Sequence, residues 1–287
     1  MASLTNLTIN DTGYIQLPSG TTTQRPASPV TGYIRFNTTL GIVEYYNGTY
    51  WLDHTTGKIS ENSIVTANLL LHLDSSKTTS YRGGNIWYDI SSQCAHGIFT
   101  NGPTYSPTDT SGGAVTFDGT NDYITISPLN TQPTSQITME GWINPTRTVS
   151  TGTVRGGVVS ATNTTYLGIF NSADGGSTHS LHWANSTSNS RPASANGNIP
   201  NNVWSHIAGT YDGATSRAYV NGTEVWSSAQ TGTIASATYV VGTYGSGLAD
   251  ALHNFQGKIA IARVYSVGLS AAQVLQNYNA QKYRFGL

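Results

Sequence analysis

The fold is decided by residues 203–225, which read VWSHIAGTYDGATSRAYVNGTEV. Apolar and polar residues alternate here in runs of no more than about eight residues, and glycine or asparagine separates the runs. The dipeptide Asn221-Gly222 lies between two runs and is a strong signal for a two-residue β-hairpin turn. The stretch therefore predicts short, consecutive antiparallel strands.

Short runs separated by glycine, asparagine or proline continue over most of the chain and predict an all-β protein. In ITMEGWINP, residues 137–145, Met139 and Ile143 lie on one strand face and Trp142 on the other. TFDGTNDYITI, residues 116–126, reads as two strands joined by a turn, with Phe117, Tyr123 and Ile124 available to the core.

One short helix is expected near the C-terminus, in SAAQVLQNYNAQ. Ser270 can cap it, and Gln273 three residues later completes a capping box. Leu269 is placed to contact Val274 across the first turn. The helix therefore begins directly after Ser270.

Composition excludes several kinds of partner. Only 9% of the residues are charged, where a quarter is typical, and the net charge is -1. Without a basic field we expect no nucleic-acid partner, and no apolar run approaches the roughly 20 residues of a membrane span. The opening MASLTNLTIN lacks the features of a signal peptide, so we expect synthesis and assembly in a cytoplasm. Cys94 is the single cysteine, which excludes an internal disulfide.

The N-terminal part of the chain has a different pattern, in TGYIRFNTTLGIVEYYNGTYW, residues 31–51. It predicts a meander of two or three short strands with turns at residues 38–41 and at Asn47-Gly48. So few strands do not hold together alone in water, so an apolar face must be covered. We expect that face to be an oligomer or attachment interface, with packing on the following domain as the alternative. Its predicted residues are Ile34, Phe36, Tyr45, Tyr46, Tyr50 and Trp51.

Three segments follow from these patterns. Residues 1–53 form an N-terminal β module for oligomerisation or attachment. Residues 54–66, HTTGKISENSIVT, are polar without a clear period and form a linker. Residues 67–287 carry many short strands between turns, which suits a two-sheet sandwich of the jelly-roll type.

Four phrases of the larger segment resemble a known family. They are residues 112–126, 137–145 and 203–225, with FQGKIAIARVYSVGLSAAQVLQNY at 255–278. In this order they resemble the laminin G-like, concanavalin A-like lectin/glucanase sandwiches. The resemblance implies a jelly-roll fold and makes sugar binding a family activity to consider.

The N-terminal phrase resembles a module of bacteriophage virion proteins such as tail and neck fibres. The residues concerned are 18–51, PSGTTTQRPASPVTGYIRFNTTLGIVEYYNGTYW. Residues 71–105, LHLDSSKTTSYRGGNIWYDISSQCAHGIFTNGPTY, are similarly typical of phage laminin G-like domains. This resemblance implies a structural component of a phage particle.

The glucanase members of the family carry Glu-x-Asp-x-Glu, which places two carboxylates about 5 Å apart on one strand face. The four glutamates here are Glu44, Glu61, Glu140 and Glu224, and none has a second carboxylate two residues away. Gly-x-Ser-x-Gly and His-Glu-x-x-His are also absent. We therefore expect no enzyme.

Metal binding has few candidate ligands. His179 and His182 are three residues apart, so a strand directs them to opposite faces and they make a poor metal pair. The family often holds calcium at the sandwich rim, and Asp118 and Asp122 are the best candidates. Residues 259–262, IAIA, lack an acidic pair that relatives carry. Two roles stay open for the aspartates, turn formation, which we favour, and calcium binding. We otherwise expect no cofactor.

Sugar recognition needs exposed aromatic rings beside hydrogen-bonding side chains. The polar stretch at residues 171–198 offers Trp183, Asn185 and Arg191. These three are the predicted glycan-binding residues.

Together the patterns and resemblances predict a non-enzymatic structural protein of the virion. We expect a homotrimeric tail or neck fibre component that contacts other virion proteins and adsorbs to host surface polysaccharide through its projecting sandwich. The alternatives are a capsid decoration protein, a carbohydrate-active enzyme and a cellular lectin or adhesion module.

Overall fold

A computed structural model describes residues 13, 15–48, 51–55, 64–109, 111–146, 155–162, 165–171, 178–185, 195–235, 237–244 and 253–287. The chain divides into two units, Met1–Ser63 and Ile64–Leu287. The division falls within the range 54–66 in which the sequence places the linker. None of the helices in the described ranges has the length and hydrophobicity of a membrane span.

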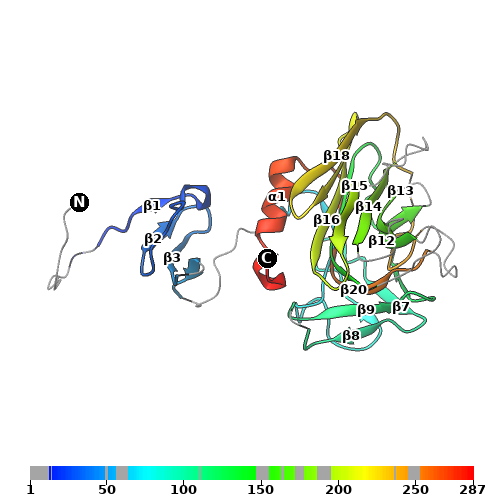
Figure 1. The fold of residues 1–287 in the computed structure, drawn as a ribbon, viewed down its shortest axis with the longest axis horizontal. Helices are drawn as coiled ribbons and strands as arrows, with labels where there is room; N and C mark the ends of the chain where they lie inside the picture. Colours follow the sequence, from blue (N-terminus) through cyan, green and yellow to red (C-terminus); the bar gives the residue numbers. More distant parts are fainter. Residues whose placement is uncertain are drawn as a thin grey trace. The chain divides into compact units, whose positions relative to one another are not determined.

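The first unit is a small four-stranded sheet in the order β1-β2-β3-β4 (Figure 1). The 3-10 helix η1 (Thr22–Gln24) follows β1. Gly41 has a φ of 68° and its N–H donates to the carbonyl of Asn37 at 2.8 Å, so the turn lies where it was predicted. The additional strand β1 pairs in parallel with β2, and the others pair antiparallel. The strands are β1 (Ser19–Gly20), β2 (Ile34–Asn37), β3 (Ile42–Tyr46) and β4 (Trp51–Asp53).

The second unit is a sandwich of two large sheets, as predicted. One, called here the β14 sheet, has the order β15-β14-β13-β12-β19-β10-β7-β6. Its strands are β6 (Ile86–Trp87), β7 (Gly97–Thr100), β10 (Tyr123–Ile126), β12 (Arg155–Thr162), β13 (Thr165–Asn171), β14 (Thr178–Asn185), β15 (Ala195–Pro200) and β19 (Val240–Val241).

The other sheet, called the β11 sheet, has the order β18-β17-β16-β11-β20-β9-β8, and β5 also pairs with β20. In Figure 1, β8 and β9 of this sheet are blue-green, β18 is yellow and β20 is orange. They are β5 (Leu69–Asp74), β8 (Thr104–Ser106), β9 (Ala114–Asp118), β11 (Ile137–Pro145), β16 (Ser205–Tyr211), β17 (Thr215–Val220), β18 (Thr223–Ala229) and β20 (Gln256–Tyr265).

The stretch at residues 203–225 forms β16, β17 and the start of β18. Asn221 and Gly222 have φ values of 49° and 76°, and Val220 pairs with Thr223 across them. Positive φ at both central residues is the geometry of the type I′ hairpin turn. The predicted hairpin is therefore confirmed.

Residues 116–126 fold differently from a hairpin. They form β9 and β10, which lie in different sheets. The four residues between them carry the chain from one sheet to the other. Phe117 and Ile124 consequently enter the same core from opposite sides.

The outer face of the β11 sheet is covered by the C-terminal helix α1 (Ala271–Asn279). Ser270 caps the helix in a capping box with Gln273, as predicted. Val274 packs in one cluster with Leu269 and Tyr265. The 3-10 helix η2 (Lys282–Phe285) follows, and the Phe285 ring stacks on Trp142 at 3.9 Å between centroids. The face of β11 opposite the core is thus buried as well.

Candidate functional site

The inner face of the small sheet in the first unit combines charged and amide side chains with the aromatic rings of Tyr46 and Trp51. Along β2, Arg35 and Asn37 are buried, whereas Ile34 and Phe36 are exposed. Register places Arg35 beside Glu44, which is fully buried. Since buried charges must be paired and hydrogen-bonded, the burial of Glu44 on this face depends on its polar contacts.

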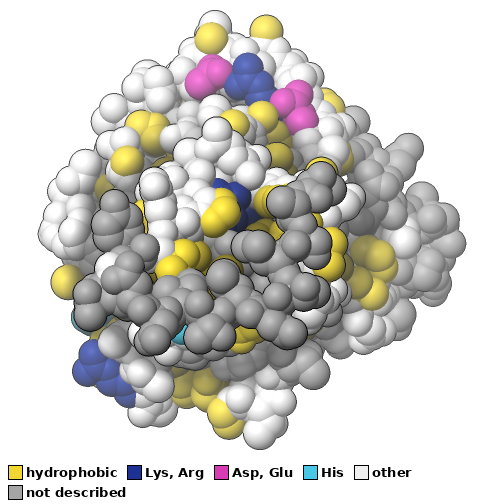
Figure 2. All heavy atoms as spheres, turned by 90° about the vertical axis from the view of Figure 1, so that its left-hand side faces the viewer, with side chains coloured by type: hydrophobic (Ala, Val, Ile, Leu, Met, Phe, Trp, Pro, Cys, Tyr) yellow, Lys and Arg dark blue, Asp and Glu magenta, His cyan; other side chains and the backbone are white. Residues whose placement is uncertain are grey.

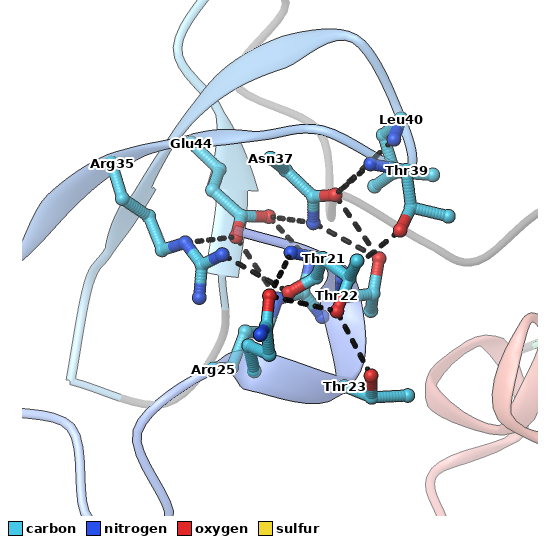
Figure 3. Close-up of polar contacts among 10 residues, drawn as sticks. Thr21, Thr22, Thr23, Arg25, Arg35, Asn37, Thr39, Leu40 and Glu44 are labelled. Atoms are coloured by element: carbon cyan, nitrogen blue, oxygen red, sulfur yellow. Dashed lines mark hydrogen bonds and ion pairs between the residues drawn. The ribbon is translucent and has the colours of Figure 1, made fainter. Parts of the chain in front are cut away.

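Glu44 is the centre of these contacts (Figure 3). Arg25 binds both carboxylate oxygens, with Nε donating to Oε1 at 3.1 Å and Nη2 to Oε2. The amide of Asn37 also donates to Oε2, at 3.1 Å. Arg35 lies further away, with 3.6 Å between its Nε and Oε1. Of these three side chains, Arg25 and Asn37 therefore form hydrogen bonds to the Glu44 carboxylate, and Arg35 forms a longer ion pair.

Asn37 connects this cluster to two backbone segments. Its Oδ1 accepts from the N–H groups of Thr39 and Leu40 at 3.0 and 3.2 Å. The hydroxyl of Thr22 hydrogen-bonds the same side chain. The segment around η1 is thereby held over the inner face of the sheet, as Figure 3 shows.

The outer face of the small sheet is apolar and accessible. Ile34 is 41% exposed and Phe36 is 37% exposed. Their cross-strand partners are Tyr45 and Val43, which extend the same face. Nine large hydrophobic side chains are exposed in the described ranges, and five belong to the first unit: Ile15, Val30, Tyr33, Ile34 and Phe36. Exposed large hydrophobic side chains are thus more frequent in the first unit than in the described part of the sandwich.

The six predicted interface residues do not form one surface. Ile34, Phe36 and Tyr45 share the outer face, but Tyr46 and Trp51 pair on the inner face. Trp51 is already buried within the chain, with the Arg25 guanidinium 5.8 Å from its ring centroid. The single-surface prediction was wrong because the strand pleat sends neighbouring aromatics to opposite sides. Tyr50 lies outside the described residues.

A pocket of about 360 Å³ opens in this first unit. It lies between the segment around η1 and the sheet. Its lining residues are Pro18, Ser19, Gln24, Pro26, Tyr33, Ile34, Arg35 and Trp51. Figure 2 shows one face of the molecule, on which few Lys, Arg, Asp or Glu side chains are visible and hydrophobic side chains are scattered among the white atoms of the backbone and of other residues.

The predicted glycan residues on the sandwich are not an exposed platform. Trp183 is 0% exposed in the core, and its Nε1 donates to the hydroxyl of Ser216 at 2.8 Å. That hydroxyl donates in turn to Asn185 Oδ1 at 3.1 Å. The two residues face inward and connect β14 to β17, so this prediction is corrected for both of them. Arg191 lies outside the described residues.

Asp118 and Asp122 form the turn between β9 and β10. Asp118 Oδ1 accepts from the N–H of Thr120 at 2.7 Å, and Asp122 Oδ2 accepts from the N–H of Asp118 at 2.9 Å. Burial raises the pKa of Asp122. In the described ranges, no group of three or more His, Cys, Asp or Glu side chains is placed to hold a metal ion. The turn role thus has direct hydrogen-bond support.

His179 and His182 have separate partners. Nε2 of His179 lies 2.7 Å from Asn201 Oδ1, and Nδ1 of His182 lies 2.6 Å from the hydroxyl of Tyr166. His182 and Tyr166 lie on the face of the β14 sheet opposite the core, where Phe170 contacts His182 at 4.0 Å between ring centroids. Tyr244 packs edge-on against Tyr166. Sequence reasoning missed this aromatic group, although strand alternation in TTYLGIF was a usable signal.

A second buried glutamate lies beneath the C-terminal helix. Glu140 Oε1 accepts from Arg263 at 2.6 Å, and Oε2 accepts from the amide of Asn277 at 3.0 Å. Nε2 of His206 is 3.6 Å from Oε2. Burial alone would raise the pKa of Glu140, but contacts from His206 and Arg263 outweigh it and lower the pKa to about 2. This arrangement attaches α1 to the sheet and has no opening to solvent.

Comparison with known proteins agrees with this fold. The model of the Concanavalin A-like lectin/glucanases superfamily matches residues 118–275, more than half of the chain. No curated protein is similar in sequence at a significant level.

Three solved structures illustrate the similarity. Domain 4 of the extracellular GH43 arabinanase of Geobacillus stearothermophilus, in complex with arabinotriose, has a TM-score of 0.55 and 19% identity, covering 75% of this chain and 100% of that one. The binding domain of Paraclostridial mosquitocidal protein 1 has a TM-score of 0.54 and 14% identity, covering 75% and 52%. Trypanosoma rangeli sialidase in complex with sialic acid has a TM-score of 0.55 and 13% identity, covering 77% and 34%. At these identities the likeness concerns the fold.

Proposed function

The chain belongs to the Concanavalin A-like lectin/glucanases superfamily, and from this premise we propose that it is a non-enzymatic structural protein of a bacteriophage particle. Its first unit self-associates, as a homotrimer, or attaches to another virion protein. Its sandwich projects from the particle as part of a tail or neck fibre and adsorbs to host surface glycans.

The observation that carries this proposal is the apolar outer face of the small sheet. Ile34 and Phe36 are exposed beside Tyr45, while charged groups occupy the inner face. Covering apolar surface contributes about 25 cal/mol per Å². A second copy or a virion partner seated on this face would supply the burial that the unit itself lacks.

The glycan-binding part rests on the family and on neighbours whose structures contain arabinotriose or sialic acid. The non-enzymatic part rests on the glutamates. Most glycoside hydrolases use two carboxylates that reach the substrate, whereas both Glu44 and Glu140 are fully buried in ion pairs. Their burial supports a structural role for both residues.

The mass of the full chain in solution tests self-association. We expect a trimer by light scattering, and a monomer for Phe36→Lys, because a charge on the outer face prevents its burial. Ile98→Lys is the matched control, since Ile98 is similarly exposed but lies on the sandwich. A monomeric wild-type chain, or dissociation by both substitutions, would contradict the assigned interface.

Two further measurements address the biological role. Antibody labelling of intact particles is expected at the tail or neck, and label over the head would replace the fibre by a decoration protein. Incubation with host polysaccharide is expected to release no reducing sugar. Release above a boiled-protein control would overturn the non-enzymatic assignment.

A further inference from the structure

The pocket of the first unit has one cation in its wall and no acid. Of its eight lining residues, Arg35 is the only charged one. Arg35 is only 6% exposed, so its guanidinium is held in place by its surroundings. A cation fixed in the wall of an otherwise uncharged pocket favours an anionic ligand.

Arg35 is not neutralised in the way that Arg25 is. Arg25 forms the two-point contact with Glu44, and Arg35 approaches the same carboxylate only to 3.6 Å. Asp53 lies opposite Glu44 in the register of β3 and β4, so it is one strand further from Arg35 than Glu44 is. Glu44 is thus shared between two guanidinium groups, and the less well matched of them lines the pocket.

Most of the hydrogen-bonding capacity of Arg35 is unused. Its Nη2 donates to the carbonyl of Thr21 at 3.0 Å, and its Nη1 has no partner in the described part of the chain. Guanidinium groups carry five N–H donors and match carboxylates in two-point contacts. Gln24 is oriented by the Thr21 N–H, which donates to its Oε1 at 2.8 Å, and it also lines the pocket. The polar part of the wall is therefore rich in donors.

The remaining wall is aromatic and apolar. Tyr33 is 45% exposed, and Pro18, Pro26 and Trp51 complete the surface around it. A volume of about 360 Å³ is at the small end of ligand pockets and suits one ring rather than an oligosaccharide. The C–H face of a pyranose is apolar and can pack on an aromatic ring, while its hydroxyls need donors and acceptors such as Gln24 and Ser19.

We propose that this pocket binds a sugar acid, with the carboxylate on Arg35 and the pyranose ring against Tyr33. The site is centred on Arg35, whose side chain lies on the inner side of the small sheet, whereas the proposed self-association uses the outer face, and Ile34 borders both. It is also separate from any glycan site on the sandwich. Failure of the sugar-acid test would therefore leave the proposed function standing, and the reverse also holds.

Calorimetric titration of the full chain with sodium glucuronate tests the proposal. We expect saturable binding, and affinity at least about tenfold lower for glucose and for the uncharged methyl ester of glucuronate, because the charge-assisted contact is lost. Arg35→Gln should weaken glucuronate binding by a similar factor. Arg82→Gln is the matched control, since Arg82 lies on the sandwich beside Tyr88, and it should bind as wild type.

Tyr33→Ala separates a sugar site from a simple anion site. It should weaken glucuronate binding several-fold and leave any weak acetate binding unchanged. The proposal is overturned if glucuronate does not bind at concentrations up to about 10 mM, if acetate binds equally well, or if Arg35→Gln binds as wild type. Should circular dichroism show that Arg35→Gln is misfolded, the comparison of glucuronate with its methyl ester on the wild-type chain decides alone.

Discussion

The two units of this protein differ in what surrounds their buried charges. The small sheet encloses Glu44 with its arginines and leaves Ile34 and Phe36 outside. The sandwich encloses a continuous apolar core and keeps its own buried glutamate, Glu140, under the C-terminal helix. The difference shows what size permits, since four short strands cannot create an apolar interior, whereas two large sheets can.

Of the substitutions that test this difference, Glu140→Gln should cause the largest loss of unfolding free energy. It leaves Arg263 buried without its counter-charge, and breaking a buried pair costs about 3–5 kcal/mol. Urea unfolding monitored by tryptophan fluorescence would measure the loss. Glu224→Gln is the control, because the Glu224 side chain is 38% exposed and its loss of charge should change the free energy of unfolding by less than about 0.5 kcal/mol. Equal losses of unfolding free energy in the two variants would show that the contacts of Glu140 do not stabilise the attachment of α1 to the sheet.

Acidification should weaken the sandwich through His72. Burial, and then the charge of Arg263, lower the pKa of His72 from 6.5 to about 3, while Asp74 and Glu140 act in the opposite direction and Lys77 lowers it further. The unfolded chain therefore binds a proton that the folded chain does not, between pH 6.5 and pH 3. The stability present above pH 6.5 falls by up to about 1.4 kcal/mol per pH unit in this window.

The measurement is urea unfolding at a series of pH values. His72→Asn should reduce the slope between pH 6.5 and pH 4.5, where carboxylates contribute little. Below about pH 4.5 the lowered pKa of Glu140 adds a further loss of stability, down to about pH 2. An unchanged slope in the variant would remove His72 from the explanation.

Glu44→Gln tests the corresponding cluster of the first unit. It leaves two guanidinium groups without their shared carboxylate, at a cost of about 2 kcal/mol, because Arg25 is partly exposed. The chain divides into two units, so the damage should remain local. Hydrogen exchange should accelerate over residues 34–46 and stay unchanged in β11 and β20. Acceleration throughout the sandwich would contradict this separation.

Gly209→Ala tests the close contact between the two sheets. A Cβ at this position would lie 2.2 Å from the Trp183 ring, so the substitution should cost about 1–3 kcal/mol by overpacking. Thermal unfolding would measure it. Adding Trp183→Leu should make the alanine less costly than it is alone, and an additive double variant would argue against direct contact.

Phe36→Ser should have the smallest effect on folding. The side chain is exposed, so the free energy of unfolding should change by less than about 0.5 kcal/mol in dilute solution. A larger loss in the monomer would place Phe36 in the interior of its own unit. The substitution thus separates a surface role from a packing role.

Much of the architecture followed from local signals in the sequence. Asn221-Gly222 predicted its hairpin, Ser270 with Gln273 predicted the start of α1, and alternation placed Met139 and Trp142 on opposite faces. Each of these depends on contacts between residues a few positions apart, or on the two-residue period of a strand. A single sequence is sufficient for such features.

Only the tertiary structure decided which side of each strand was the inside. Trp183 was expected at the surface and lies in the core, and Trp51 was assigned to an interface with residues that face the other way. The contacts of the two buried glutamates likewise depend on partners that are distant in the chain. They are the contacts of Glu140 with Arg263 and Asn277, and of Glu44 with Arg25. The sequence by itself determined strands, turns and the helix cap, because these are local. The assignment of faces and of ion partners required the packed structure, because burial is a property of the whole fold.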